Sequence, residues 1–365
     1  MKVTLLSENL QKKLSLANHA ISSRNQLPIL AHVLLETKEG KLSLSSTDLE
    51  IGIETTVPCQ VDEDGATTVP AKLFLEIVNS LPQDKIILET KDGTLHIISK
   101  RTKSVLQTTP KDEFPMLYSE KGEKLLTFVK GSFKEIFSKV VFASSVEATR
   151  PALSGVLVKK THNGFVVVAT DGYRLSLDEV KQNEEAQLQK PVIIPSRLIK
   201  EATNLSEGGD VTMYISEKNN QLLFEQEETV LVGRVIEGEF PHYEKVVPTD
   251  VATKAFFDRE EMQKAVKLCA IFARETANII TLSLLKDKIV VAAKTPSLGE
   301  NTVEVEARLE GEENEIAFNV RYIVEALSNI PDNDMAFEMT GPLNPGVFKI
   351  VSKPEFLHLI MPIRI

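Results

Sequence analysis

The sequence repeats itself at an interval close to 125 residues, and this repeat limits the possible folds more than any single motif does. Pro70, Pro195 and Val320 lie 125 residues apart, and each stands at the start of an amphipathic run with a helical period. Behind each run follow a polar turn and two stretches of alternating residues, which predict a hairpin and a further strand. The order helix, hairpin, strand therefore recurs three times.

Segments outside these helices repeat as well. Three pairs of matching segments are offset by 123 to 126 residues: LAHVL at 30–34 with LSGVL at 153–157, Thr47-Asp48 with Thr170-Asp171, and Glu-Phe-Pro at 113–115 with Glu-Phe-Pro at 239–241. A unit of this size far exceeds the ~20–50 residues of solenoid repeats, so each copy can bury a core of its own. The sequence predicts three α+β domains, over 1–120, 127–247 and 252–365. Gene duplication without any functional geometry stays open, because duplication alone specifies neither a ring nor an array.

Charge is divided unevenly between the predicted helices and the rest of the chain. The sequence predicts six helices, over 7–24, 70–81, 130–145, 195–206, 258–275 and 319–330. They hold 14 Lys and Arg against 9 Asp and Glu, whereas the whole chain carries a net charge of −10. The remainder therefore carries −15. If the helices share one face of each domain, that face is mildly basic and could admit DNA, which the acidic strands and loops would repel.

Composition removes several classes of function. A net charge of −10 argues against nucleic-acid binding unless the charges are segregated. The absence of Trp, together with an aromatic content of only 6%, makes a single-strand binder improbable, because such a protein needs aromatic stacking platforms. The six His are scattered, no phosphate-binding loop or GxSxG motif is present, and the two Cys lie far apart. We therefore expect no enzymatic activity, no cofactor and no metal. The start of the chain lacks the apolar core of a signal peptide, and no stretch is long enough to span a membrane, which predicts a cytoplasmic protein.

One polar cluster, Thr170-Asp171-Gly172-Tyr173-Arg174, has two interpretations. Asp171 as a base beside Arg174 as an anion clamp would suit a hydrolase. A tight turn, in which Asp171 bonds to its own backbone and Gly172 takes a positive φ, explains the same residues without chemistry.

Six segments resemble the bacterial DNA polymerase III beta subunit, the sliding clamp: RNQLPILAHVLLE at 24–36, TRPALSGVL at 149–157, ATDGYRLS at 169–176, VIIPSR at 192–197, EGEFPHYEKVVP at 237–248 and MPIRI at 361–365. They run through the whole chain in order. The resemblance implies a head-to-tail homodimeric ring with three similar domains per subunit, helices around a hole for duplex DNA and sheets outside. It also implies a processivity factor that binds the replicative DNA polymerase, the clamp loader and other replication and repair proteins.

The resemblance further implies three sets of site residues. Inward-facing DNA contacts match Arg24, Lys72, Arg150 and Arg197. The dimer interface matches Ser104 and Leu106 on one side and Ile271 and Phe272 on the other. A hydrophobic groove for partner peptides, between the second and third domains, matches Leu153, Thr170, Gly172, Tyr173, Arg174, Leu175, Pro241, Val246, Asn319, Tyr322, Val347, Ile360, Met361, Pro362, Ile363 and Arg364.

The chain departs from the family pattern at Pro151-Ala152, where some clamps place aromatic residues that touch DNA, and at Lys245, where others have arginine. The repeats by themselves would equally permit a triplicated protein-binding scaffold that never meets DNA. A hydrolase built on Asp171 and Arg174 is the third hypothesis.

Overall fold

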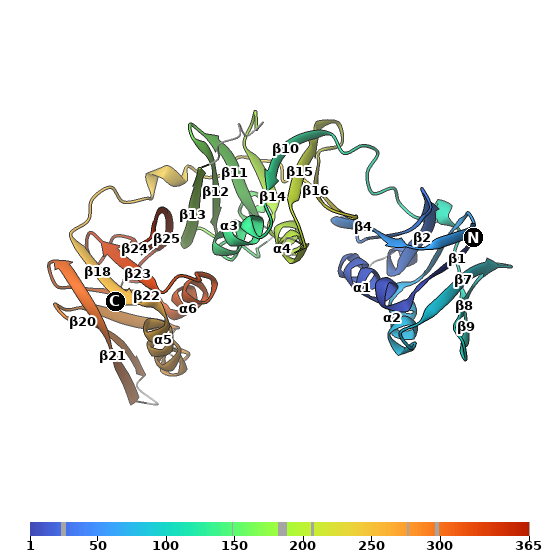
Figure 1. The fold of residues 1–365 in the computed structure, drawn as a ribbon. Helices are drawn as coiled ribbons and strands as arrows, with labels where there is room; N and C mark the ends of the chain where they lie inside the picture. The colour runs from blue at the N-terminus through green and yellow to red at the C-terminus, as the bar shows by residue number, and fades with distance from the viewer. Residues whose placement is uncertain are drawn as a thin grey trace. The chain divides into compact units, whose positions relative to one another are not determined.

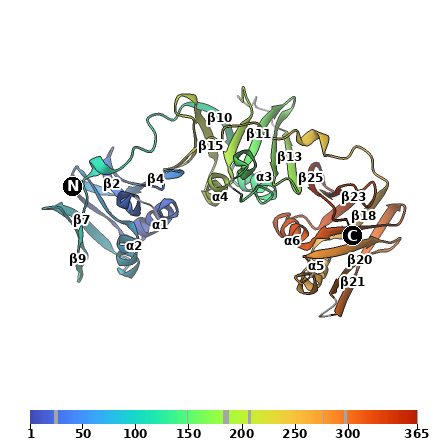
Figure 2. The same ribbon diagram turned by 180° about the vertical axis from the view of Figure 1, so that it is seen from behind.

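A computed structural model describes residues 1–22, 27–147, 149–181, 188–205, 208–275, 277–295 and 299–364 (Figures 1 and 2). It confirms all six predicted helices: α1 Ser7–Ala17, α2 Ala71–Ser80, α3 Ser132–Val141, α4 Ser196–Leu205, α5 Arg259–Ala273 and α6 Val320–Asn329. The helices are shorter than predicted, most of all α1, which passes into a 3-10 turn at Asn18–Ala20. No helix of the described residues is long and apolar enough to cross a membrane.

The strands form three sheets, all with antiparallel pairing. A five-stranded sheet has the order β5 (Gln60–Glu63), β1 (Lys2–Leu6), β7 (Lys85–Lys91), β8 (Thr94–Ile98) and β9 (Lys103–Gln107). An eight-stranded sheet has the order β10 (Glu123–Phe128), β15 (Val211–Ser216), β16 (Gln221–Gln226), β17 (Thr229–Arg234), β4 (Ile51–Pro58), β3 (Lys41–Thr47), β2 (His32–Lys38) and β6 (Ala66–Pro70).

The third sheet has twelve strands, in the order β14 (Val192–Pro195), β11 (Gly155–Thr161), β12 (Gly164–Thr170), β13 (Arg174–Lys181), β25 (Lys353–Ile360), β24 (Gly346–Ile350), β23 (Asp334–Met339), β18 (Thr253–Asp258), β21 (Gly299–Gly311), β20 (Lys288–Thr295), β19 (Ile279–Leu284) and β22 (Asn314–Asn319). The predicted hairpins are confirmed as β7–β8, β15–β16 and β23–β24, and each is followed by the expected further strand.

Helices pack in pairs against these sheets. Helix α1 contacts α2, and α5 contacts α6 (Figure 1). The first pair buries Leu10, Leu14 and Phe74 in one core, and the second pair buries Val266 and Ile323 in another. Apolar residues at helical spacing thus form the cores that the sequence pattern predicts.

Contacts between residues divide the chain into two compact units. One unit comprises Met1–Gly131 and Asn204–Val235, and the other comprises Ser132–Thr203 and Ile236–Ile365. The middle repeat is shared between them, because its two outer strands continue the sheets of its neighbours. Strand β17 pairs with β4 in the first unit, and β13 pairs with β25 in the second. We call these two pairings the first seam and the second seam.

The two seams are built alike but carry different polar groups. Thr55 lies opposite Thr229 at the first seam, and their hydroxyl oxygens are 2.8 Å apart. Asp178, offset by 123 residues from Thr55, lies opposite Phe356 at the second seam. There the Asp178 carboxylate forms a buried ion pair of 2.9 Å with the Nζ of Lys139 on α3. Burial raises the pKa of Asp178, while Lys139 opposes that shift.

Lys139→Met should lower the free energy of unfolding by about 3–5 kcal/mol, because it leaves the Asp178 carboxylate buried without its cation. The double variant Lys139→Met/Asp178→Leu should recover most of the loss. The loss in the single variant should shrink as pH falls, since protonation of Asp178 removes the unpaired charge. Urea unfolding followed by circular dichroism measures these changes.

The matched control is Lys181→Met, which breaks the exposed Lys181–Glu355 pair between β13 and β25, the strands of the second seam. This variant should change the free energy of unfolding little. An equal loss in both single variants would show that burial does not decide the strength of these pairs.

Candidate functional site

A cavity of about 290 Å³ lies in the second unit, beside the turn between β12 and β13 and the last residues of the chain. We call it the terminal groove. Its lining residues are Arg150, Leu153, Thr170, Gly172, Tyr173, Arg174, Leu175, Pro241, His242, Tyr243, Val246, Leu359 and Met361. Three apolar side chains of this lining face solvent: Tyr173 is 65% exposed, Val246 45% and Met361 39%. Exposed apolar side chains gathered in one cavity mark a binding surface.

The turn from Thr170 to Arg174 forms one wall of the groove. The Thr170 hydroxyl accepts the N–H of Gly172 at 3.0 Å and donates to the Arg174 carbonyl at 2.6 Å. Asp171 Oδ1 accepts the N–H groups of Tyr173 and Arg174. Gly172 has a φ of +93°, which only glycine adopts without strain. The turn interpretation is therefore confirmed, and the turn holds the Tyr173 ring out toward solvent.

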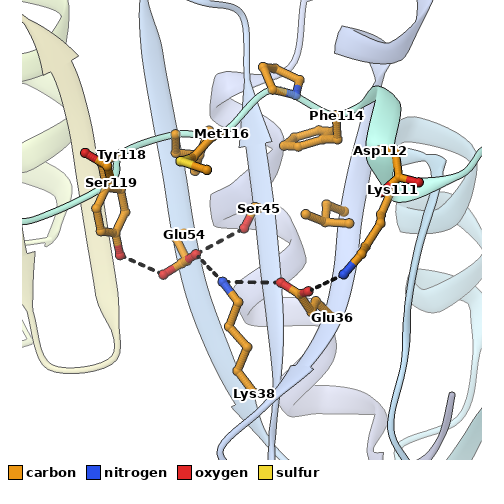
Figure 3. A pocket seen from close by; sticks show the side chains of 13 residues that line it. Glu36, Lys38, Ser45, Glu54, Lys111, Asp112, Phe114, Met116, Tyr118 and Ser119 are labelled. Atoms are coloured by element: carbon orange, nitrogen blue, oxygen red, sulfur yellow. Dashed lines mark hydrogen bonds and ion pairs between the residues drawn. The ribbon is translucent and has the colours of Figure 1, made fainter. Parts of the chain in front are cut away.

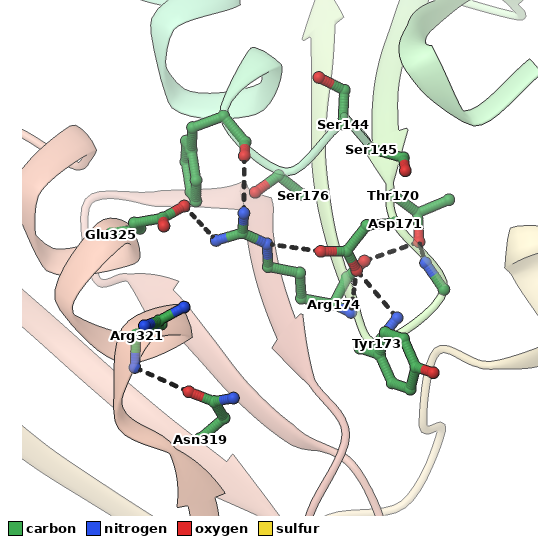
Figure 4. A network of polar contacts seen from close by, with 12 residues as sticks. Ser144, Ser145, Thr170, Asp171, Tyr173, Arg174, Ser176, Asn319, Arg321 and Glu325 are labelled. Atoms are coloured by element: carbon green, nitrogen blue, oxygen red, sulfur yellow. Dashed lines mark hydrogen bonds and ion pairs between the residues drawn. The ribbon is translucent and has the colours of Figure 1, made fainter. Parts of the chain in front are cut away.

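Arg174 connects this turn to α6 and to Phe142, the residue that follows α3 (Figure 4). Its Nε donates to Asp171 Oδ2 at 3.1 Å, and its Nη2 donates to the carbonyl of Phe142 at 3.0 Å. Its Nη1 lies 2.6 Å from a carboxylate oxygen of Glu325 on α6, and its guanidinium stacks over the Tyr322 ring at 4.8 Å. The guanidinium is buried and already pairs with two carboxylates, those of Asp171 and Glu325, which argues against an anion clamp for a hydrolase.

Leu359 and Met361, near the end of the chain, line the groove beside this turn. Beyond the end of β25, the N–H of Met361 donates to the carbonyl of Tyr173, and the N–H of Ile363 donates to the carbonyl of Ala317 on β22, both at 2.8 Å. Two backbone bonds thus hold the terminal segment against the turn and the neighbouring strand. They place the Met361 side chain in the cavity.

Nine of the predicted groove residues line the cavity: Leu153, Thr170, Gly172, Tyr173, Arg174, Leu175, Pro241, Val246 and Met361. Seven others do not: Asn319, Tyr322, Val347, Ile360, Pro362, Ile363 and Arg364. Asn319 caps α6 by accepting the N–H of Arg321, and Tyr322 lies against Arg174. Val347 and Ile360 are buried in the cores next to the groove.

The prediction missed three lining residues, His242, Tyr243 and Leu359, and it assigned the fourth, Arg150, to DNA. His242 and Tyr243 follow Pro241 directly, so the Glu-Phe-Pro repeat could have indicated them. Leu359 precedes Met361 by two residues, and the period of two along a strand puts both side chains on one face.

A larger cavity, of about 600 Å³, lies in the first unit under residues 111–119 (Figure 3). Its polar lining residues mostly pair with one another. Glu54 accepts hydrogen bonds from the Tyr118 hydroxyl at 2.7 Å and from Lys38 at 3.1 Å, and Glu36 accepts one from Lys111 at 3.2 Å. None of the predicted site residues lies in this cavity.

The predicted DNA-binding residues lie in different parts of the chain. Lys72 is exposed on α2 in the first unit. In the second unit, Arg197 is half-buried in the first turn of α4, and Arg150 is exposed at the rim of the terminal groove. Arg24 lies outside the described residues.

The predicted interface residues differ in exposure. Ser104 and Leu106 lie on β9, an edge strand, but Leu106 is only 6% exposed and belongs to the core of the first unit. On α5, Ile271 is 56% exposed and Phe272 is half-buried. Ile271 therefore presents an apolar surface to solvent, whereas Leu106 does not.

No group of His, Cys, Asp and Glu suited to hold a metal ion occurs among the residues that the structure describes.

Comparison with known proteins matches the whole chain to one family. Three family models match: the N-terminal domain of the DNA polymerase III beta subunit at residues 1–118, the central domain at 128–242 and the C-terminal domain at 244–364. Beta sliding clamps of Synechococcus elongatus and Caulobacter vibrioides are each 30% identical over the full length of both chains.

Solved structures agree with this match. The sliding clamp of Bacillus subtilis superposes with a TM-score of 0.94 at 26% identity, covering 100% of this chain and 99% of that one. A Pseudomonas aeruginosa clamp bound to griselimycin gives 0.94 at 27%, with both chains fully covered. This chain therefore belongs to the family of the DNA polymerase III beta subunit, the sliding clamp that acts in DNA replication as a processivity factor without being an enzyme.

Proposed function

We propose that two copies of this chain join head to tail in a cytoplasmic ring around duplex DNA. We further propose that the terminal groove takes peptide segments of the replicative polymerase, the clamp loader and other replication and repair proteins. Family membership over all three repeats supports the ring, and it disfavours a scaffold that never meets DNA. The single observation that carries the groove is the set of exposed apolar side chains, Tyr173, Val246 and Met361, around one cavity.

The groove suits a short extended peptide with apolar side chains. Its walls are pre-formed, because the turn and the terminal segment are each fixed by hydrogen bonds before any ligand arrives. A pre-formed site loses little entropy when it binds, and Met361 is a flexible side chain that adapts to different partners. Arg150 at the rim adds a positive charge.

Tyr173→Asp and Met361→Asp should each weaken peptide binding roughly 30-fold, because central apolar anchors contribute about 2 kcal/mol or more. Fluorescence anisotropy with a labelled peptide containing Gln-Leu-Ser-Leu-Phe measures the affinity. Leu343→Asp is the control, since Leu343 is exposed in the same unit but does not line the groove. Unchanged affinity in both groove variants would rule out the groove as the peptide site.

Two unpaired strand edges support the dimer. Among the described strands, β9 pairs with β8 alone. On β21, residues 299–306 pair with β20 on one side, whereas β18 pairs only with Ala307–Gly311. An open edge is a template for pairing with another chain. We propose that β9 of one copy pairs with the 299–306 edge of the other.

Charges along these edges favour opposite partners over identical ones. Lys103 begins β9, and Arg101 precedes it by two residues. Glu300, Glu304 and Glu306 lie along the edge of β21. Lys294 and Lys288 of the same chain pair with Glu300 and Glu304. Complementary charges steer association and disfavour edges of like sign. A contact between two different surfaces repeats head to tail and closes when the rotation allows it.

Ile271→Asp should give a folded monomer, because the exposed side chain tolerates a charge in the free subunit but not in a desolvated interface. Analytical ultracentrifugation distinguishes the 40.5 kDa chain from a dimer of twice that mass. Leu343→Asp serves as the control and should stay dimeric. Leu106→Asp is unsuitable, since Leu106 is buried within its own unit. A persistent dimer of Ile271→Asp at low micromolar concentration would contradict this interface.

The acidic net charge is compatible with DNA binding if the ring holds DNA topologically. Binding that depends on phosphate contacts loses about 10³–10⁵ in affinity between 50 and 200 mM salt. A closed ring loses little, because it retains DNA without phosphate contacts for as long as the interface between its subunits stays shut. After loading on a nicked circle, the protein should survive a salt wash and leave within minutes once a restriction enzyme linearises the DNA.

Substituting Lys72, Arg150 and Arg197 together by Ala should slow loading more than it shortens retention on the circle. Gel filtration of radiolabelled protein with circular or linear DNA measures both. Equal loss from circular and linear DNA would exclude topological binding and favour the scaffold.

A further inference from the structure

A second cavity of about 290 Å³ lies at the first seam, in the first unit of the chain. We call it the β4 pocket. Its walls come from three places: the turn between β3 and β4, residues 115–117, and the end of β17. The proposed function of the chain uses none of these residues.

The turn beside the β4 pocket reproduces the turn of the terminal groove bond for bond. The Thr47 hydroxyl accepts the N–H of Leu49 at 2.9 Å and donates to the Ile51 carbonyl at 2.8 Å. Asp48 Oδ1 accepts the N–H groups of Glu50 and Ile51, both at 3.0 Å. These are the bonds that Thr170 and Asp171 make 123 residues later.

The other two walls are equivalent as well. Residues 115–117 line the β4 pocket as residues 241–243 line the terminal groove, with the repeated proline at the start of each segment. At the seams, Gly52 lies opposite Val232 as Leu175 lies opposite Leu359. Arg234, two residues beyond Val232, therefore takes the place of Met361. The β4 pocket is the counterpart of the terminal groove in the preceding repeat.

Two side chains of the β4 pocket are apolar and unpacked. Leu49 occupies the place of Gly172, with a φ of +76° and a side chain that is 53% exposed. Met116 is 81% exposed. Leucine in a left-handed conformation is strained, and strain of this kind is typical of binding sites. An aliphatic side chain held out by a strained turn beside an exposed methionine offers apolar surface to a ligand.

The exposure of Met116 does not result from an unattached loop. Figure 3 shows the segment around Met116 fixed on both sides. The Tyr118 hydroxyl donates to Glu54 on β4, and Lys111 donates to Glu36 on β2. Met116 thus stands on a segment that is anchored before and after it, between the larger cavity and the β4 pocket, both of which it lines.

Charge distinguishes the β4 pocket from the terminal groove. Arg234 is exposed, and it makes no ion pair with any residue in the described part of the chain. Glu50, in the place of Tyr173, also lines the pocket, and the strand register puts it next to Arg234, so an anion would have to approach Arg234 from the side away from Glu50. A ligand with one carboxylate beside an apolar side chain suits this arrangement, provided that the carboxylate faces Arg234.

We propose that the β4 pocket is a second peptide-docking site, which takes an extended segment of a partner protein that carries an aliphatic or aromatic side chain next to a carboxylate. The proposal rests on the proposed function in one respect: the terminal groove, its counterpart, is taken to bind peptides. The two sites differ in ligand preference through Arg234 and Leu49.

Methionine-methyl NMR of the full chain tests both sites at once, because Met116 lines the β4 pocket and Met361 the terminal groove. Met116 also lines the larger cavity, so the Leu49 variants decide between the two, since Leu49 lines the β4 pocket and not the larger cavity. The probes are two capped pentapeptides, Ser-Leu-Phe-Asp-Gly and Ser-Leu-Phe-Lys-Gly, and the Gln-Leu-Ser-Leu-Phe peptide. We expect the Asp peptide to shift the Met116 resonance, and we expect the same shift to require an at least fivefold higher concentration of the Lys peptide. Arg234→Glu should reverse that preference, and Leu49→Asp should abolish the shift.

Leu49→Gly is a second variant, which removes the apolar side chain and relieves the strained φ. Because this change should not destabilise the fold, a loss of peptide binding in this variant could not be ascribed to misfolding. Leu343→Asp is the control and should leave Met116 unaffected. The proposal is overturned if no peptide shifts the Met116 resonance while Gln-Leu-Ser-Leu-Phe shifts that of Met361. It is also overturned if the Asp and Lys peptides bind with equal affinity. A Met116 shift on raising protein concentration alone would assign the pocket to self-association instead. Failure of Met361 alone would refute the terminal groove and not the β4 pocket.

Discussion

Backbone pairing at the two seams is the constraint on which the rest of this structure depends. A single repeat leaves strand edges with unpaired N–H and C=O groups, and the chain satisfies them by joining the outer strands of successive repeats, β4 to β17 and β13 to β25. The seam also determines where a binding site can form. At each seam a turn, a proline-containing segment and the end of a strand come together, and a cavity of about 290 Å³ remains between them.

Pairing at the seams also explains why contacts between residues group the three repeats into two compact units. Repeats in the sequence predict three domains, and family models match three. Hydrogen-bonded sheets nevertheless continue from one repeat to the next, so the compact units separate within the middle repeat. Sequence periodicity identifies what was duplicated, whereas contacts identify what is packed together. The boundaries of the repeats and of the compact units need not coincide when strands of successive repeats pair with each other.

Local features of the fold could be predicted from the sequence, and long-range contacts could not. Helix positions followed from apolar spacing, and the Thr170–Arg174 turn followed from Asp and Gly in a short polar cluster. The partners of Arg174 could not be predicted, because Phe142 and Glu325 are far away in sequence. The burial of Leu106 was missed for a similar reason: its strand alternates between core and solvent, and only the neighbouring β8 shows which face is which.

The β4 pocket and the terminal groove differ at positions where a change of side chain leaves the hydrogen bonds of the turn intact. The turns at 47–51 and 170–174 keep Thr and Asp, whose side chains make the four bonds that define the turn. Positions that line the cavity differ: position 49 is leucine where its counterpart 172 is glycine, and position 234 is arginine where its counterpart 361 is methionine. Farther along the seams, Thr55, which contacts Thr229, corresponds to Asp178, which pairs with Lys139. A turn fixed by its own backbone bonds leaves the side chains around it free to change, so one architecture can hold two sites of different ligand preference in a single chain.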